Sequence, residues 1–264
     1  TSGQQPSSTQ LACIASYNPL HEYSWCHLLS IPTELESLQR RQILEPEKEK
    51  QLRSTIPILQ EIKNEVSCKV REQYEQNPYP RWVNLQLPPV PKHISVITKE
   101  LNLRISNLGI DNVVAPQILI AGCGTGEHSI ISSFVIKNCD ILAIDLSLSS
   151  VAYAKRKTEE LGISNIEYMQ ADILDLLSLD RKFDIIESGG VLHHMDDPMA
   201  GWKVLTDCLN TGGFMRIGLY SESARKHIVQ IRDEIEQSNI ESSHDAMKSF
   251  RNEIVSSEEE HYKR

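Results

Sequence analysis

Five short apolar segments alternate with helical segments between residues 117 and 219, and this alternation leaves few folds open to the chain. The expected strands are 117–121, 140–145, 166–170, 183–187 and 213–219, and the expected helices between them are 127–137, 148–161 and 197–209. Strand, helix and strand in succession form a parallel sheet, because a right-handed crossover needs a connection of helix length. We therefore predict an α/β fold, a mostly parallel sheet with helices on both faces.

The segments outside this alternation differ from it in composition. Apolar residues recur at helical spacing between residues 11 and 69, which predicts helices that precede the sheet and pack on it. Residues 75–92 hold five prolines, so this segment is extended, and a short helix over 94–103 follows it. We expect four regions: helices over 1–70, a proline-rich lead-in and helix over 71–115, the α/β domain over 116–222 and a charged helical segment over 223–264.

Composition excludes several classes of partner. The chain has 264 residues and a formal net charge of −9, and it contains no run of Lys and Arg, so no nucleic-acid partner is expected. No stretch approaches the roughly 18 apolar residues of a membrane span. The six cysteines form no C-x-x-C pair, which indicates reduced thiols and a cytoplasmic protein. Because the chain opens at Thr1 and stops in a helical pattern, we expect a longer parent protein.

The stretch "ILIAGCGTG", residues 118–126, ends a strand in three glycines. Gly122, Gly124 and Gly126 allow backbone angles that a Cβ forbids, and they let a ligand lie against the peptide plane. A dinucleotide fingerprint needs G-x-G-x-x-G before a helix that faces a diphosphate, whereas here the spacing is G-x-G-x-G and Glu127 follows. This pattern favours a nucleoside-like ligand with a positive group and no diphosphate, although a tight turn alone would also need these glycines.

Two aspartates stand at the ends of the next two predicted strands. Asp145 closes "ILAID" and can accept hydrogen bonds from both hydroxyls of a ribose, or it can help Ser147 to start the following helix. Asp172 follows the third strand in "MQADIL" and can accept from the amine of an adenine, or it can cap a local turn. Three such features in order, each at a strand end, indicate a nucleoside site at the carboxyl edge of the sheet.

Over residues 116–221 these motifs resemble the class I S-adenosylmethionine-dependent methyltransferases. "ILIAGCGTGEHS" resembles their first motif, "AIDLSLSSVAYAK" their second and "YMQADIL" their third, and "FDIIESGGVLHHMDD" resembles the fourth strand and the loop on its substrate side. The resemblance implies a Rossmann-like domain, S-adenosylmethionine as cofactor, and a methyl-acceptor substrate. The cofactor residues that it implies are Gly122, Cys123, Gly124, Gly126, Asp145, Leu146, Ala171, Asp172, Ile173, Glu187 and Arg81.

A narrower resemblance comes from "REQYEQNPYPRW" and "RIGLYSESARKHI", which flank the predicted domain. Both are similar to bacterial methyltransferase domains attached to tetratricopeptide repeats, and to rickettsial lysine methyltransferases that act on outer-membrane proteins. This likeness implies a protein lysine as acceptor, and a small-molecule acceptor remains open. The Asn/Asp-Pro-Pro-aromatic motif of adenine and glutamine methyltransferases is absent, since "ESGGVLHH" stands in its place.

The candidates for contact with the acceptor are His193, Glu187 and Tyr79. His193 and His194 are adjacent in a loop and have no third ligand at suitable spacing, so no metal is expected. The aromatic-rich segment that holds Tyr79 either packs as ordinary structure or folds over the mouth of the cofactor site. Cys123 is expected to fill space in the turn and not to act as a nucleophile.

Two other functional classes stay open on the sequence alone. A nicotinamide-dependent dehydrogenase shares the strand order and the acidic end of the second strand, but it disagrees with the glycine spacing and with Glu127. A non-catalytic Rossmann-like interaction module would keep the fold without the chemistry. The helical regions on either side of the domain could also support an oligomer.

Overall fold

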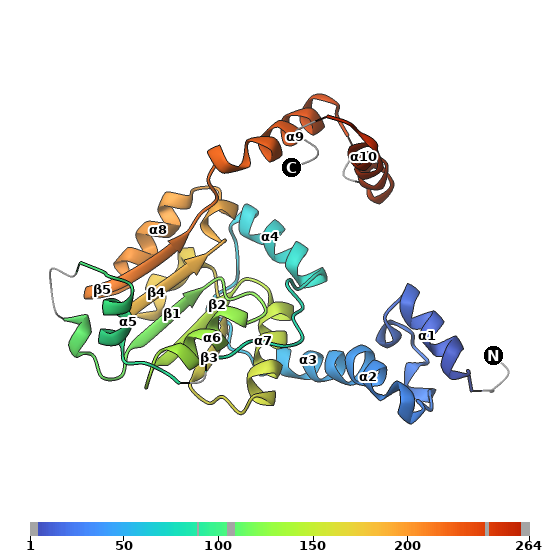
Figure 1. The fold of residues 1–264 in the computed structure, drawn as a ribbon, viewed down its shortest axis with the longest axis horizontal. Helices are drawn as coiled ribbons and strands as arrows, with labels where there is room; N and C mark the ends of the chain where they lie inside the picture. The colour runs from blue at the N-terminus through green and yellow to red at the C-terminus, as the bar shows by residue number, and fades with distance from the viewer. Residues whose placement is uncertain (1–4, 89, 105–108, 241–242, 260–264) are drawn as a thin grey trace. The chain divides into compact units, whose positions relative to one another are not determined.

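The computed structural model describes residues 5–88, 90–104, 109–240 and 243–259 (Figure 1). The chain divides into two compact units, Thr1–Ile217 and Gly218–Arg264. The expectation of a longer parent protein is based on the two ends of the sequence. Residues 1–4 and 260–264 lie outside the described ranges.

The described residues of the first unit build a five-stranded sheet in the order β3-β2-β1-β4-β5. β1 pairs in parallel with both β2 and β4, and β2 pairs in parallel with β3. Figure 1 shows β5 running beside β4 at one edge. The predicted α/β fold with a parallel sheet is thus confirmed. The strands are β1 (Gln117–Ala121), β2 (Asp140–Asp145), β3 (Ile166–Gln170), β4 (Phe183–Gly189) and β5 (Leu209–Gly218).

Several element ends differ from the prediction. β4 continues to Gly189, and β5 already begins at Leu209, because the backbone N–H of Phe183 donates to the carbonyl of Cys208 and brings the two strands together there. The helices are shorter than predicted at their carboxyl ends. They are α5 (Ile94–Glu100), α6 (Glu127–Val135), α7 (Leu148–Glu160) and α8 (Pro198–Asp207), and short 3-10 turns are η5 (Ile110–Asn112), η6 (Ile173–Leu179) and η7 (Leu192–His194).

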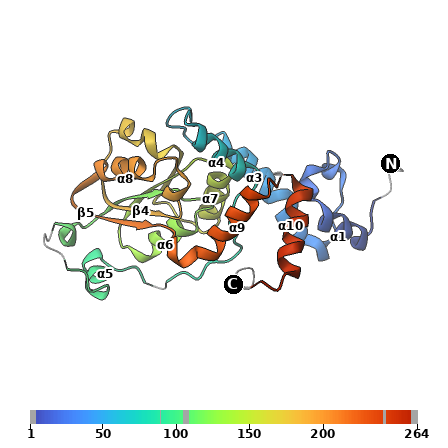
Figure 2. The same ribbon diagram turned by 90° about the horizontal axis from the view of Figure 1, so that it is seen from above.

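Helices cover both faces of the sheet, as Figure 2 shows with α8 on one side of the strands and α5 and α6 on the other. Alternate residues of β1 serve the two faces: Ile118 and Ile120 join the core with α5 and α7, whereas Leu119 and Ala121 join the core with α8 and η6. Because both faces are buried, the strands read as continuous apolar runs in the sequence.

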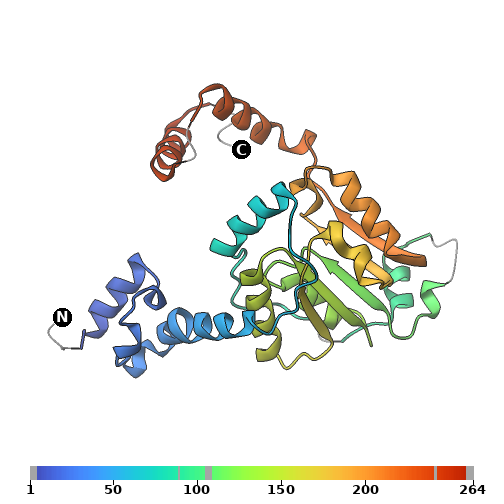
Figure 3. The same cartoon turned by 180° about the vertical axis from the view of Figure 1, so that it is seen from behind.

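The N-terminal helices are continuous with this unit. α3 and α4 both pack against α7, which confirms the predicted packing of these helices on the domain. The connection between α3 and α4, the blue trace in Figure 3, pairs with the end of β3 because Gln170 exchanges backbone hydrogen bonds with Pro57 and Leu59. The helical segments are α1 (Ser8–Tyr17), η1 (Leu20–Glu22), η2 (Cys26–Leu28), η3 (Thr33–Leu35), α2 (Glu36–Gln39), η4 (Arg40–Leu44), α3 (Glu45–Arg53) and α4 (Glu65–Gln76).

The second unit is helical, as predicted. It consists of η8 (Ser223–Arg225), α9 (Lys226–Gln237) and α10 (His244–Ser256). Ile228, Ile231 and Ile235 form a half-buried stripe on α9. Of all helices in the described ranges, none combines the length and the apolar character that crossing a bilayer requires.

Candidate active site

The glycine turn connects β1 to α6 and is built from left-handed backbone. Gly122, Gly124 and Gly126 have φ angles of 80°, 53° and 85°. A Cβ at Gly122 would lie 2.3 Å from a methyl of Val191, and one at Gly126 would lie 2.5 Å from the Cβ of Ala154. A Cβ at Gly124 would have one atom of the described residues within 4 Å beyond its chain neighbours, the carbonyl oxygen of Tyr79 at 3.6 Å. The outer glycines are therefore needed for packing, whereas no side chain of the described residues lies within 4 Å of a Cβ placed on the middle one.

Asp145 ties the glycine turn to the end of β2. One carboxylate oxygen accepts the N–H of Gly124 at 2.8 Å, and the other accepts the N–H of Ser147 at 2.9 Å. Burial raises the pKa of this carboxyl above its ordinary value, the two hydrogen bonds oppose that rise, and the nearby charge of Glu75 adds to it. Each oxygen keeps a second lone pair, so the carboxylate can still accept from two further donors.

The second predicted aspartate sits at the start of η6. The Asp172 side chain is 4% exposed and accepts the N–H of Leu174 at 3.0 Å, so it does cap the local turn. Its neighbours Ala171 and Ile173 are buried in the core on the α8 side. Leu146 is half-buried after β2, and its carbonyl accepts from the side chain of Gln170 at 2.7 Å. These residues all lie at the carboxyl ends of β2 and β3.

Glu187 lies on β4 and faces α6. Its carboxylate forms an ion pair with the Nε2 of His128 and accepts from the Ser132 hydroxyl at 3.4 Å. Burial alone raises the pKa of Glu187, but the hydrogen bond and charge of His128, together with Arg216 and Ser132, hold the net pKa below its ordinary value. His128 and Ser132 were not identified from the sequence, because α6 brings them to β4 only in the folded chain.

The proline-rich segment crosses the glycine turn. The Thr125 hydroxyl donates to the carbonyl of Pro80 at 2.5 Å, and the Trp82 indole N–H donates to the carbonyl of Thr125 at 3.1 Å. These two hydrogen bonds hold the segment against Thr125 of the turn. Tyr79 itself is 73% exposed, and the Arg81 guanidinium binds Glu49 of α3 at 2.9 Å.

His193 is half-buried and His194 exposed, and their rings lie 4.3 Å apart in η7, just beyond the carboxyl end of β4. Within the described ranges, no three His, Cys, Asp or Glu side chains are grouped to hold a metal ion. Burial raises the pKa of the Cys123 thiol well above its ordinary value, and the charge of Asp145 adds to the rise. This thiol therefore stays protonated at neutral pH and is a poor nucleophile.

A pocket of about 360 Å³ opens at the opposite edge of the sheet. It is lined by Gln117 and Asp140, the first residues of β1 and β2, and by Arg181. The candidate residues instead gather at the carboxyl ends of the strands, where parallel sheets bind ligands. A bare glycine turn, two carboxylates with spare lone pairs and flanking apolar residues suit an adenosyl group, whereas Glu127 at the start of α6 disfavours a diphosphate.

Part of the chain is similar to known proteins. Residues 115–262, more than half of the chain, match a family model described as a methyltransferase domain. An uncharacterized protein of Synechococcus is 36% identical over 121 residues, which cover 46% of this chain and 29% of that protein. A demethylmenaquinone methyltransferase of Bacillus cytotoxicus is 29% identical over 92 residues, 34% of this chain and 39% of that protein.

Among solved structures, PKMT2 from Rickettsia typhi in complex with AdoHcy is similar with a TM-score of 0.46 and 21% identity. That match covers 64% of this chain and 34% of the Rickettsia chain. Together these matches span 29 to 39% of the length of the relatives.

Proposed function

The chain belongs to the methyltransferase domain family, and we propose that it is a class I enzyme that transfers the methyl group of S-adenosylmethionine to a nucleophilic acceptor. The observation that carries this activity is the glycine turn after β1, which Asp145 joins to the end of β2 through the N–H of Gly124.

Each candidate residue receives one role in this proposal. S-adenosylmethionine supplies a methyl group already activated on a sulfonium, so the protein contributes alignment and exclusion of water. The backbone around Gly122, Cys123, Gly124 and Gly126 supports the cofactor, and Asp145 accepts from the ribose hydroxyls. Asp172 accepts from the adenine amine, and the ring is flanked by Leu146, Ala171 and Ile173.

Glu187 and Arg81 are expected from the sequence to contact the cofactor, and Glu187 also the acceptor. We instead propose that they support the site without contacting either. Both side chains already have a partner within the chain, because Glu187 binds His128 and Arg81 binds Glu49. We therefore assign Glu187 to the support of the first turn of α6. His193, beyond the end of β4, and Tyr79, exposed beside the turn, remain the candidates for contact with the acceptor.

We propose a protein lysine as the acceptor, on the likeness of the flanking segments "REQYEQNPYPRW" and "RIGLYSESARKHI". A lysine must first lose a proton, and its ordinary pKa of about 10.4 must fall on burial or the proton must pass to a neighbour such as His193. A small-molecule acceptor is the second candidate, because the relative from Bacillus cytotoxicus is a demethylmenaquinone methyltransferase.

Two experiments test the proposal in sequence. Calorimetric titration with adenosylhomocysteine, and in parallel with NAD, tests the cofactor: we expect heat of binding from adenosylhomocysteine alone. Incubation with methyl-labelled S-adenosylmethionine and a cell lysate then tests the acceptor, with label expected in protein and released as methyl-lysine on hydrolysis. Label in the small-molecule fraction would favour the second candidate, and binding without any transfer would indicate a non-catalytic module.

The compartment is also a proposal. All six cysteines lie in the described ranges and are free thiols. Free thiols are typical of a reducing cytoplasm, which supports the expected location.

A further inference from the structure

Residues 78–82, which we term the cap segment, lie on the glycine turn without belonging to a helix or strand. Two hydrogen bonds hold them there, from the Thr125 hydroxyl to Pro80 and from the Trp82 indole to Thr125. The Tyr79 carbonyl oxygen lies 3.6 Å from the position that a Cβ of Gly124 would occupy. The cap segment therefore covers the part of the turn that the proposed cofactor contacts.

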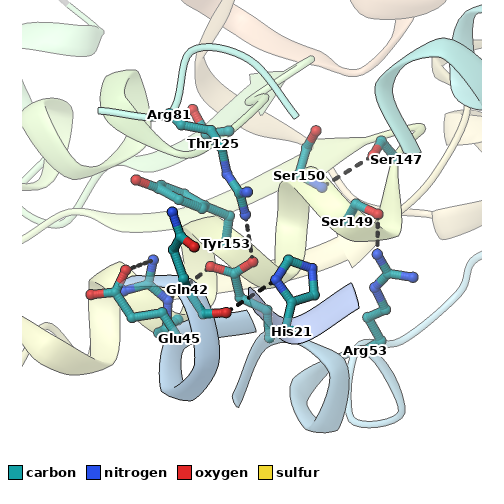
Figure 4. A network of polar contacts seen from close by, with 12 residues as sticks. His21, Gln42, Glu45, Arg53, Arg81, Thr125, Ser147, Ser149, Ser150 and Tyr153 are labelled. Atoms are coloured by element: carbon teal, nitrogen blue, oxygen red, sulfur yellow. Dashed lines mark hydrogen bonds and ion pairs between the residues drawn. The ribbon is translucent and has the colours of Figure 1, made fainter. Parts of the chain in front are cut away.

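The cap segment is anchored from the side by α3 and α7. Arg81 extends past the ring of Tyr153 (Figure 4), with the guanidinium 5.3 Å from the ring centre. The same guanidinium lies 2.9 Å from the carboxylate of Glu49. The Tyr153 hydroxyl donates to the carbonyl of Trp82, and the Lys157 ammonium donates to the carbonyl of Val83 at 3.2 Å.

The Glu49 carboxylate, which pairs with Arg81, is also held by a second arginine. Glu49 is 10% exposed at its side chain and also accepts from Arg156 at 2.9 Å. Arg156 is almost fully buried and binds Glu160 at 2.6 Å as well. α3 thus presents a carboxylate held by Arg156 to the cap segment, whereas the Arg81 side chain is about half exposed.

We propose that the ion pair of Arg81 with Glu49 sets the closed position of the cap segment and thereby slows release of the cofactor. This inference rests on the proposed function, since it assumes that the glycine turn holds S-adenosylmethionine. Arg81 and Glu49 act as positioning residues. Through Glu49, helix α3 influences the cofactor site without contacting the cofactor.

Arg81→Gln tests the proposal, with adenosylhomocysteine as the probe and its dissociation rate measured by stopped flow. Loss of a charged hydrogen bond from the closed form should speed dissociation about tenfold. Arg81→Lys keeps the charge and should recover most of that loss. The melting temperature is measured without ligand as well. A purely structural effect of the substitution would lower the melting temperature and leave the dissociation rate unchanged.

Arg181→Gln is the matched control. Arg181 also pairs with a glutamate, Glu167, at 2.8 Å and lies over an aromatic ring, that of Phe183, but at the far edge of the sheet. We expect an unchanged dissociation rate in this variant. Equal rates in the unchanged chain and in Arg81→Gln would overturn the cap proposal and leave the proposed function standing. No binding to the unchanged chain would overturn the proposed function and the cap proposal together.

Discussion

The backbone N–H of Gly124 donates to the carboxylate of Asp145 across 2.8 Å, so this side chain joins the turn after β1 to the end of β2. Asp145 therefore has a structural task in addition to the ribose contact that we propose for it. A substitution at Asp145 must therefore be evaluated for both tasks.

Asp145→Ala should lower both stability and affinity. The N–H groups of Gly124 and Ser147 lose their acceptor, which should cost about 1–3 kcal/mol of unfolding free energy in urea titrations. Stabilisation by adenosylhomocysteine should disappear while the far-UV spectrum is unchanged. Asp140→Ala, at the other end of the same strand, is the control and should retain ligand stabilisation. Full ligand stabilisation in Asp145→Ala would refute the ribose contact.

Asp172 offers a cleaner separation, because serine can replace its capping function. Asp172→Ser should keep the hydrogen bond to the N–H of Leu174 and stay within about 0.5 kcal/mol of the unchanged chain, whereas Asp172→Ala should lose about 1 kcal/mol. If the carboxylate also holds an adenine amine, both variants should bind adenosylhomocysteine at least tenfold more weakly by calorimetry. Normal affinity in Asp172→Ser would leave Asp172 as a cap only.

Gly126→Ala should be strongly destabilising. The new Cβ would meet Ala154 at 2.5 Å in a left-handed backbone, and overpacking together with backbone strain should cost about 2–4 kcal/mol. Gly162→Ala is the matched control, because its φ is also positive but no atom lies within 4 Å, so only the strain of about 1–2 kcal/mol is expected. Equal losses of unfolding free energy in the two variants would contradict the close approach of α7 to the turn.

Glu187→Gln should alter the pH dependence of stability. The pKa of Glu187 in the folded chain lies below its ordinary value of 4.5, so its charged form contributes stability above that value. The contribution is lost as pH falls through the lower, folded-state pKa. The difference in unfolding free energy between the unchanged chain and Glu187→Gln should therefore shrink as pH falls below 4.5. An undiminished difference well below pH 4.5 would contradict the lowered pKa of Glu187.

The local sequence predicted much of the fold because its signals act over a few residues. β1, β2 and β3 have the predicted bounds, since continuous apolar runs are required by strands buried on both faces. β5 was predicted too late, because Gly212 and Gly213 resemble a turn. In the folded chain Gly213 lies against β4, and a Cβ at this position would be 2.7 Å from the carbonyl oxygen of Asp184. This position of β5 therefore needs a glycine because there is no room for a side chain.

The sequence by itself determined which groups stand at the carboxyl ends of the strands: three glycines and two aspartates, at positions that a parallel sheet brings to one edge. The tertiary structure alone decided what each polar side chain binds. Asp145 and Gly124 are 21 residues apart, and Arg81 and Glu49 are 32 apart. No spacing rule pairs such residues, because a hydrogen bond or ion pair forms wherever packing of the apolar core brings donor and acceptor within about 3 Å.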